Sequence, residues 1–317
     1  MDEVREIVAS LEENIEKVIV GKDEAIRLII IALLCQGHVL IEDIPGVGKT
    51  TMVSALARSL DLTFRRIQFT PDVLPSDITG FSMYNFKNGE LEFHPGMVMG
   101  QVILADEINR TSPKTQSSLL EAMEEGQVTV DGKTHYLPQP FIVLATQNPV
   151  EYVGTFPLPE AQLDRFFLKV TIGYPSKREE MHIMSRFQYS NPLDSLEAVA
   201  SKEDILKLQK LTRQVKVAEA IRDYIASLVG MTRDHPDLTL GSSPRGSLFL
   251  MKASQAHAML DGRDYVIPDD VQKMVIPVLS HRLILKPEAR LKEMTPERIL
   301  RSIINTVYVP LGDLAYD

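Results

Sequence analysis

The first 175 residues alternate between short apolar runs and longer segments in which apolar residues recur every three or four positions. The short runs predict strands and the longer period predicts helices. Strands are expected at residues 38–42, 64–69, 102–105 and 141–146, and helices at about 4–18, 23–36, 49–60 and 113–125. Short buried strands that alternate with helices are typical of a parallel sheet covered on both faces. The pattern therefore predicts an α/β fold with a doubly wound parallel sheet.

Two segments interrupt this alternation, and the pattern changes after them. Residues 72–100 hold several glycines and scattered aromatic residues, and residues 127–138 alternate about Asp131-Gly132, which indicates a hairpin. Beyond Pro175 strand-like runs are rare. Helices are expected at about 176–189, 202–214, 217–233, 244–260, 268–280 and 296–308. We therefore expect one domain over residues 1–175 and a smaller helical domain over residues 176–317.

Composition excludes several classes of protein. The 317 residues carry 43 acidic and 34 basic side chains, a net charge of −9, which argues against broad nucleic-acid binding. The longest apolar run, residues 28–35, has eight residues, whereas a membrane-spanning helix needs about 20. The acidic N-terminus lacks the apolar core of a signal peptide, so we expect a cytoplasmic protein without a membrane segment. The single cysteine, Cys35, is interpreted as a buried apolar residue.

Residues 42–51 join a predicted strand to a predicted helix, which is the setting that a phosphate-binding loop requires. Gly46 and Gly48 would let backbone N–H groups surround phosphate oxygens. Lys49 would reach the β- and γ-phosphates, and the Thr50 hydroxyl would ligate Mg²⁺. The usual pattern has glycine at position 43. This chain has aspartate there, so we expect that carboxylate to point away from the phosphates.

Polar residues follow the next two predicted strands. Asp106 and Glu107 come directly after residues 102–105, and Asn148 ends the following strand. In a phosphate-loop ATPase, Asp106 would hold Mg²⁺ through water, and Glu107 would orient and deprotonate the attacking water. An amide at position 148 can hold the same water near the γ-phosphate. Taken alone, each feature also fits an ordinary loop, and Asn148 fits a turn before Pro149.

These motifs belong to a longer series, and the series resembles the MoxR-type ATPases of the AAA+ superfamily. The matching segments are Pro45-Gly46-Val47-Gly48-Lys49-Thr50, Ala105-Asp106-Glu107-Ile108-Asn109-Arg110, Pro113-Lys114-Thr115-Gln116, Leu120-Glu121-Ala122-Met123-Glu124-Glu125, Ala145-Thr146-Gln147-Asn148-Pro149 and Leu158-Pro159-Glu160-Ala161-Gln162-Leu163-Asp164-Arg165-Phe166. The similarity covers essentially the whole chain in the same order. It implies an αβα AAA+ ATPase domain, with inserts at residues 72–100 and 127–138, followed by a small all-helical lid.

The resemblance also implies roles for particular residues. Arg165 matches the arginine finger that reaches the γ-phosphate of the next subunit, and Arg245 matches a lid arginine that touches the γ-phosphate of its own subunit. Arg110 is a further candidate for action on a neighbour. The implied ATP-binding residues are those of the phosphate loop and of the segment that packs on adenine, namely Val20, Gly21, Pro45, Gly46, Val47, Gly48, Lys49, Thr50 and Thr51.

The implied activity is Mg²⁺-dependent ATP hydrolysis by a homo-oligomeric ring, commonly a hexamer. Similar proteins act as chaperone-like remodellers or maturation factors for client proteins, often with a separate partner that carries a von Willebrand factor A domain. The two inserts face a central pore or a client in related rings. The catalytic set is then Lys49, Glu107, Asn148, Arg165 and Arg245, with Thr50 and Asp106 on the metal.

Three other functions are less well supported. A nucleic-acid motor would need basic inserts, but residues 72–100 set Lys87 against Glu90 and Glu92. A GTPase would need an Asn-Lys-x-Asp guanine reader, which the sequence lacks. A scaffold without hydrolysis has no use for the residues that match Glu107 and Arg165. The seven histidines contain no pair three or four residues apart, so the spacing indicates no histidine-built metal site.

Overall fold

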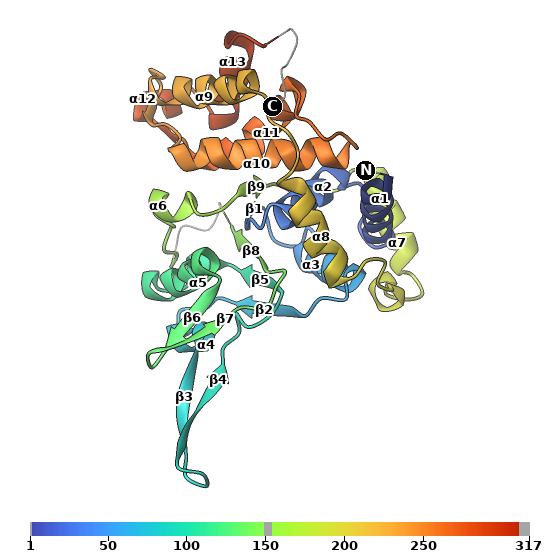
Figure 1. Ribbon diagram of the computed structural model, residues 1–317, viewed down its shortest axis with the longest axis vertical. Helices are drawn as coiled ribbons and strands as arrows, with labels where there is room; N and C mark the ends of the chain where they lie inside the picture. The colour runs from blue at the N-terminus through green and yellow to red at the C-terminus, as the bar shows by residue number, and fades with distance from the viewer. Residues whose placement is uncertain (1, 149–153, 311–317) are drawn as a thin grey trace.

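A five-stranded parallel sheet forms the centre of the molecule. The computed structural model describes residues 2–148 and 154–310 (Figure 1). The strand order is β2–β5–β8–β1–β9, and each of the four pairings is parallel. The strands are β1 (Val39–Glu42), β2 (Phe64–Gln68), β5 (Val102–Asp106), β8 (Ile142–Gln147) and β9 (Leu168–Val170). The predicted parallel sheet is confirmed, and the short β9 adds a strand that was not predicted.

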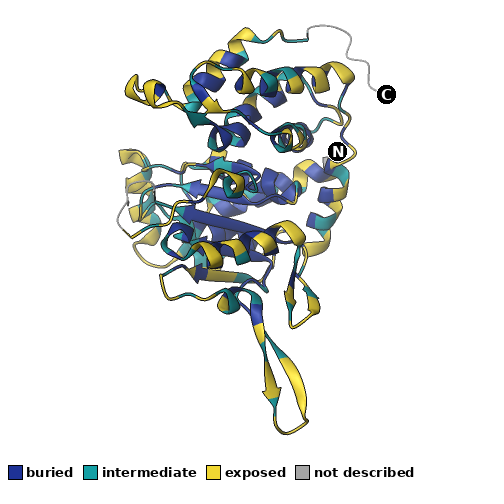
Figure 2. Ribbon diagram, turned by 90° about the vertical axis from the view of Figure 1, so that its left-hand side faces the viewer, coloured by how far each residue is buried: buried dark blue, intermediate teal, exposed yellow. Residues whose placement is uncertain are grey.

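Helices cover both faces of this sheet, because successive strand residues point to opposite sides. Leu40 and Ala145 pack with α5 in one apolar cluster, whereas Val39 and Leu144 pack with α2 and α3 in the other. Figure 2 shows the buried strands between these layers. The helices are α1 (Asp2–Glu16), α2 (Asp23–Leu34), α3 (Lys49–Ser59), α4 (Pro75–Thr79) and α5 (Pro113–Glu125). The arrangement is the expected αβα sandwich.

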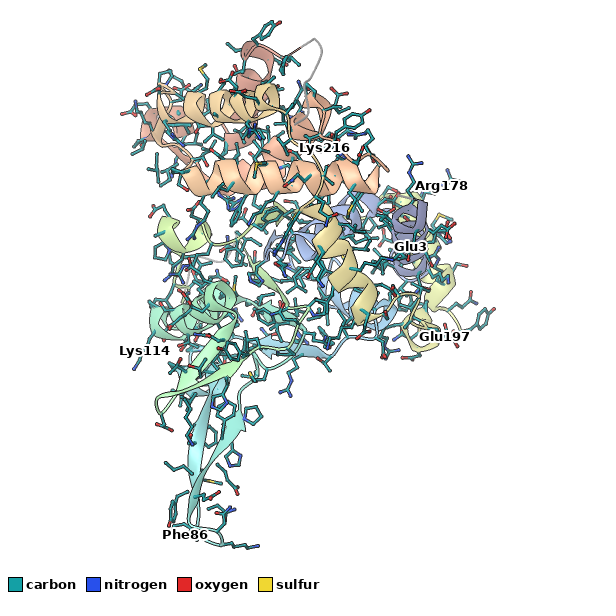
Figure 3. All side chains as sticks on the ribbon, viewed as in Figure 1. Glu3, Phe86, Lys114, Arg178, Glu197 and Lys216 are labelled. Atoms are coloured by element: carbon teal, nitrogen blue, oxygen red, sulfur yellow. The ribbon has the colours of Figure 1, made fainter. Side chains whose placement is uncertain are left out.

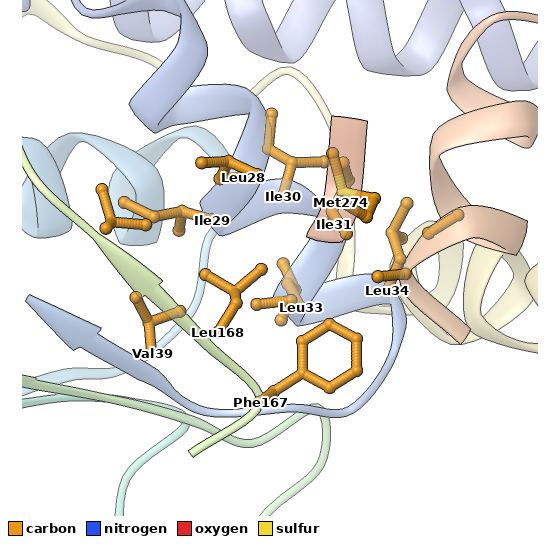
Figure 4. Packing of buried hydrophobic residues seen from close by; sticks show 14 of the residues in the cluster. Leu28, Ile29, Ile30, Ile31, Leu33, Leu34, Val39, Phe167, Leu168 and Met274 are labelled. Atoms are coloured by element: carbon orange, nitrogen blue, oxygen red, sulfur yellow. The ribbon is translucent and has the colours of Figure 1, made fainter. Parts of the chain in front are cut away.

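Helix α2 is buried on nearly every side, which explains the long apolar run in the sequence. Figure 4 shows its leucines and isoleucines between the sheet residues Val39 and Leu168 and the lid residue Met274. The helix ends at Leu34, two residues before the predicted end. Gln36, rather than Gly37, has the left-handed backbone (φ 54°). Gly37 is needed for another reason, since a Cβ there would lie 2.4 Å from the Phe167 ring.

Both inserts contain antiparallel hairpins. In residues 72–100, β3 (Gly80–Asn85) pairs with β4 (Glu90–Pro95), and this ribbon projects from the body with Phe86 at its tip (Figures 1 and 3). In residues 127–138, β6 (Gln127–Val130) pairs with β7 (Lys133–Tyr136). Positive φ angles at Asp131 (49°) and Gly132 (75°) give the expected Asp-Gly turn.

The second half of the chain is mainly helical, and each of the six expected helices lies within two residues of its predicted bounds. The helices are α6 (Glu160–Leu163), α7 (Lys177–Phe187), α8 (Lys202–Thr212), α9 (Glu219–Arg233), α10 (Pro244–Leu260), α11 (Pro268–Leu279), α12 (Pro287–Leu291) and α13 (Pro296–Thr306). A small antiparallel pair, β10 (Leu238–Leu240) with β11 (Ile284–Leu285), joins the lid helices.

Helices α7 and α8 lie beside the ATPase-like core, whereas α9–α13 form the separate upper layer in Figure 1. Helix α8 contacts α2, and Arg186 of α7 bonds to the Glu16 carbonyl at the end of α1. The domain boundary near residue 175 therefore stays a prediction, because two helices beyond it contact the core. Within residues 2–148 and 154–310, no helix has the length and apolar character that crossing a membrane requires.

His38, at the start of β1, generates a prediction about stability and pH. Its Nδ1 accepts a hydrogen bond from the Val143 N–H at 3.0 Å, so Nε2 must carry the proton that it donates to the Met123 carbonyl at 3.0 Å. Burial lowers the pKa of His38 from 6.5 to about 4. The stability contributed by the neutral ring is therefore present above pH 6.5 and is lost as the pH falls toward 4.

We expect the free energy of unfolding of the wild type to fall, relative to that of His38→Gln, by about 2 kcal/mol between pH 7 and pH 5. Glutamine keeps a donor and an acceptor but does not titrate, so other ionisable groups cancel in the comparison. Urea unfolding of both proteins across this range measures the difference. If the difference in unfolding free energy between the two proteins is the same at pH 7 and pH 5, the lowered pKa of His38 is contradicted.

Candidate functional site

The phosphate loop lies between β1 and α3 with its backbone open to ligand. Gly48 caps α3, and both Gly46 (φ 84°) and Gly48 (φ 88°) have left-handed backbones. A Cβ at either position would meet no atom within 4 Å, so the space above the loop is free. Lys49 begins the helix, and its Nζ lies 3.0 Å from the Asp43 carbonyl. Backbone N–H groups at a helix N-terminus in this form bind phosphate readily.

Asp43 points away from this space, as the sequence analysis required. Its Oδ2 accepts hydrogen bonds from the N–H groups of Ile172 (2.6 Å) and Gly173 (2.7 Å), and its Oδ1 accepts one from Ile44 (2.9 Å). The carboxylate is buried, with 6% of the residue exposed. It therefore ties the phosphate loop to the chain that follows β9, a contact that glycine at this position could not make.

Thr146 organises the acidic pair at the end of β5. Its hydroxyl donates to Asp106 Oδ1 at 2.7 Å and accepts from the Glu107 N–H at 2.9 Å. Glu107 has a left-handed backbone (φ 57°), which is unusual for a residue other than glycine and is often found at functional sites. One hydroxyl on β8 thus fixes both carboxylate residues of β5.

Two residues of β2 that the sequence analysis missed complete this arrangement. Gln68 donates from Nε2 to Glu107 Oε2 at 2.9 Å. Arg66 donates both to Gln68 Oε1 at 2.9 Å and to Asp106 Oδ2 at 2.7 Å. Arg110 also reaches its own Glu107, with Nη1 3.2 Å from Oε2. The only signal for Arg66 and Gln68 is the pairing of β2 with β5, which sets Gln68 opposite Asp106 and Arg66 opposite Leu104. That register cannot be derived from the sequence alone.

These groups surround one cavity of about 420 Å³ at the carboxyl edge of the sheet. The cavity is lined by most of the expected ligand and catalytic residues, by Thr146, and by the two residues that were not expected, Arg66 and Gln68. The full lining is Pro45, Gly46, Gly48, Lys49, Thr50, Thr51, Arg66, Gln68, Asp106, Glu107, Thr146 and Asn148. Val47 instead packs against the apolar core. The structure therefore brings together the phosphate loop, the acidic pair and Asn148.

Val20 and Gly21 are not among the residues that line this cavity. Val20 is half-buried and Gly21 is exposed. The neighbouring Lys22 bonds through Nζ to the Tyr174 carbonyl at 3.1 Å, and Tyr174 directly follows the Gly173 N–H that Asp43 holds. The segment expected to pack on adenine is thus linked to the phosphate loop through the chain after β9.

Arg165 and Arg245 lie outside the phosphate-loop cavity and share one carboxylate. Arg165 Nε is 3.2 Å from Glu124 Oε2, and Arg245 Nη2 is 2.7 Å from Glu124 Oε1. Both arginines line a second cavity of about 250 Å³ together with Lys252. Arg245 was expected at the nucleotide of its own subunit. In this structure it lies instead beside the candidate arginine finger.

Cys35 also lines this second cavity. The residue is half-buried rather than fully buried, and its Sγ donates to the Lys252 carbonyl at 3.3 Å. Burial raises the pKa of the thiol to about 12. The thiolate, which is the reactive form of cysteine, is therefore suppressed at neutral pH.

One group of histidine and carboxylate residues in the described part of the chain has the spacing of a metal site. His257, Asp261 and Asp270 lie together in the lid. Arg263 occupies their centre, however, with Nη1 and Nη2 each 2.6 Å from an oxygen of Asp270, and His257 Nδ1 is 2.7 Å from the same carboxylate. The cluster is a buried ion-pair network that lowers the pKa of Asp270.

Comparison with known families agrees with this fold and site. The model of the ATPase family associated with various cellular activities (AAA) matches residues 38–168, and the model of the AAA lid domain matches residues 230–303. A parallel five-stranded sheet with this phosphate loop, followed by a helical lid, defines an AAA+ ATPase fold.

Relatives that match the whole chain show which type of AAA+ ATPase it is similar to. The uncharacterized protein YeaC of Bacillus subtilis is 54% identical over 98% of this chain and 97% of its own length. Chaperone MoxR1 of Mycobacterium tuberculosis is 42% identical over 94% of this chain and 81% of its own. A crystal structure from Cytophaga hutchinsonii, of a protein provisionally described as an ATPase, has a TM-score of 0.91 at 38% identity and covers 98% and 96% of the two chains. The chain belongs to the MoxR-type AAA+ ATPases.

The buried Asp43 carboxylate predicts that the usual glycine would be harmful here. Asp43→Gly would leave the N–H groups of Ile172 and Gly173 without acceptors, and we expect it to lower the free energy of unfolding by about 3 kcal/mol. Asp72→Gly removes an exposed loop carboxylate and is expected to change stability by less than about 0.5 kcal/mol. Urea unfolding of the three proteins measures both effects. Equal stability of wild type and Asp43→Gly would contradict this role.

The bridging hydroxyl of Thr146 predicts a change in metal dependence. Thr146→Val keeps the shape but removes the bonds to Asp106 and Glu107, so we expect the Mg²⁺ concentration needed for half-maximal nucleotide binding to rise about 10- to 100-fold. Thr146→Ser retains the hydroxyl and should stay near wild type. Titration of Mg²⁺ against a fluorescent ATP analogue tests this. An unchanged midpoint for the valine variant would show that the hydroxyl does not organise the metal site.

Proposed function

We propose that this protein is a Mg²⁺-dependent ATPase that works as a homo-oligomeric ring, commonly six subunits in related proteins, and remodels partner proteins in the cytoplasm. The observation that carries the proposal is the 420 Å³ cavity, in which the phosphate loop, Asp106, Glu107 and Asn148 converge. This set supplies positioning and electrostatic stabilisation, which are the main requirements of phosphoryl transfer.

The residues present fit Mg²⁺ and a triphosphate. Thr50 and Asp106 offer a hydroxyl and a carboxylate on one side of the cavity, and Mg²⁺ prefers oxygen ligands. The open space above Gly46 and Gly48 suits phosphate oxygens. When bound, Mg-ATP supplies the reactive phosphoanhydride bond and a local positive charge.

Each of the chain's own groups would then have a separate role in hydrolysis. Glu107 would accept a proton from water, and Asn148 would hold that water in line. Gln68 and Arg66 would keep the acidic pair in place, because they already bond to Glu107 and Asp106. Lys49 would exchange its bond to the Asp43 carbonyl for phosphate oxygens and so neutralise developing charge.

The site is incomplete within one subunit. Arg165 and Arg245 lie together on Glu124 and outside the phosphate-loop cavity. Three basic residues, Arg165, Arg245 and Lys252, line the second cavity. They face Glu124, and Arg245 Nε is also 4.0 Å from Asp164 Oδ2, so basic groups outnumber carboxylates there. We therefore propose that both arginines act on the nucleotide of the adjacent subunit, which makes assembly a condition of fast hydrolysis.

The projecting ribbon supports contact with partner proteins rather than nucleic acid. On β3–β4 the large apolar side chains Met83, Phe86 and Leu91 are 54%, 90% and 57% exposed. An exposed apolar surface of this kind marks a site of protein contact. The ribbon is joined to β6–β7 by Phe93 and His135, whose rings stack at 3.7 Å, and β6 follows α5 directly.

These contacts connect the nucleotide site to the ribbon that we propose binds the partner. The acidic pair leads through α5 to β6–β7 and from there to β3–β4. The partner would be a client protein or, on the family resemblance, a separate protein with a von Willebrand factor A domain.

A composite site predicts that ATP hydrolysis per subunit rises with protein concentration until the ring is complete. Glu107→Gln should lower that rate about 10²- to 10⁴-fold, because the amide cannot accept the proton. It should leave nucleotide affinity nearly unchanged. Phosphate release measured from the nanomolar to the micromolar range tests both points. A concentration-independent rate from a monomer would contradict the composite site, and full activity of Glu107→Gln would contradict its role as base.

A further inference from the structure

Arg282 of the lid is a buried cation that the reaction described above does not use. The sequence alone indicates nothing for His281-Arg282 beyond packing or a solvated face. In the structure only 1% of the Arg282 side chain is exposed, and it lies 5.1 Å from the centre of the Phe249 ring. Burial lowers the pKa of Arg282 to about 10, so the group still carries its charge at neutral pH.

The guanidinium holds the residues on both sides of Arg165. Its Nη2 donates to the Phe166 carbonyl and, at 3.3 Å, to the Asp164 carbonyl. Its Nε lies 3.0 Å from Asp164 Oδ1, an ion pair whose angle falls outside hydrogen-bond geometry. His281 Nε2 is a further 3.2 Å from the Phe166 carbonyl. One lid side chain therefore fixes the backbone from which the candidate finger projects.

The other oxygen of Asp164 is also held by the lid. Ser243 Oγ, at the N-terminus of α10, donates to Asp164 Oδ2 at 3.0 Å. Two residues further along is Arg245, which shares Glu124 with Arg165. The lid therefore holds residues 164–166 through Asp164. Arg165 and Arg245 both pair with Glu124 of α5 in the core.

Close packing leaves this contact little freedom. Arg282 also donates to the Val278 carbonyl in its own helix region. A Cβ added at Gly246 of α10 would lie 2.0 Å from Ser242 Oγ and 3.4 Å from Arg282 Cδ. The absence of a side chain at Gly246 allows α10 and Arg282 to approach closely, so a rotation of the lid must move residues 164–166 with it.

Stability alone is a weak reason for such an arrangement. Removing a guanidinium from water is unfavourable, and a well-packed apolar residue stabilises many cores as well or better. What an apolar residue cannot supply is a planar guanidinium that donates to carbonyl oxygens in fixed directions and carries a charge beside a carboxylate. Arg282 makes the directional bonds to the Asp164 and Phe166 carbonyls and the ion pair to the Asp164 carboxylate.

We propose that Arg282 is a positioning residue, which couples the lid to Arg165 and so sets the finger for the neighbouring subunit's nucleotide. The inference rests on the proposed function, because it requires Arg165 to act across the interface. Arg282 does not contact the phosphate-loop cavity of its own chain. Its loss should therefore affect turnover at a neighbour's site and not nucleotide binding at its own.

The test is complementation between defective subunits. Arg282→Lys keeps the charge but not the fork, and Arg282→Met keeps the apolar stem alone. We expect each to lower kcat about 10- to 100-fold, since a displacement of about 1 Å can have that effect, with unchanged nucleotide affinity. Mixed with Glu107→Gln subunits, each should regain activity above the sum of the separate rates. In the mixture the intact Glu107 of an Arg282 variant meets the intact finger of a Glu107→Gln subunit.

Controls separate this inference from the proposed function. Arg165→Ala mixed with Glu107→Gln should also recover. If that pair fails, the finger in trans is wrong. If it recovers but neither Arg282 variant does, or if Arg282→Lys alone has wild-type kcat, the positioning role is wrong. Arg290→Met removes an exposed lid arginine and should behave as wild type. If Arg282→Met does not fold, the lysine variant alone decides the outcome.

Discussion

The parallel pairing of β5, β8 and β1 is the constraint on which the site depends. Leu40 of β1 and Ala105 of β5 both pair with Ala145 of β8. The three strands are therefore in register and end at one edge. The phosphate loop, the acidic pair and Asn148 follow those ends directly, so a shift in register would separate them. The buried cores on both faces fix that register, because a slip of one residue would exchange the apolar sides of a strand.

Charged and polar contacts fix the orientation of segments that the apolar core alone does not orient. Asp43 ties the loop to the chain after β9, and Thr146 ties β8 to the acidic pair. The lid shares an apolar cluster with α1–α3, but its directional link to the core is through Asp164 and Arg282. An apolar surface can slide, whereas a guanidinium that donates to backbone carbonyls holds one orientation. The phosphate loop and residues 164–166 are thus each fixed by a buried charge.

Much of this could be predicted from the sequence because the signals are local. The phosphate loop is defined by the spacing of Gly46, Gly48 and Lys49 between a strand and a helix. The Asp131-Gly132 hairpin and the lid helices are likewise marked by residues close in sequence. Even the orientation of Asp43 followed from the need to keep a carboxylate away from phosphate.

The rest depends on contacts between distant residues, which a single sequence does not reveal. Arg66 and Gln68 contact the acidic pair only because β2 lies beside β5. β9 has three residues, too few for a periodic signal. Arg282 looks like a surface arginine until α10, α11 and residues 164–166 are assembled around it. Gly37 leaves room for the Phe167 ring, a contact that joins residues 130 positions apart.

The central claim is that a subunit completes its neighbour's nucleotide site. The most direct test is a structure of the assembled protein with Mg²⁺ and a non-hydrolysable ATP analogue. We expect Arg165 to leave Glu124 and its guanidinium to lie about 3 Å from the γ-phosphate bound to the adjacent phosphate loop. An assembly in which Arg165 stays on Glu124, with no phosphate of a neighbour within reach, would contradict it.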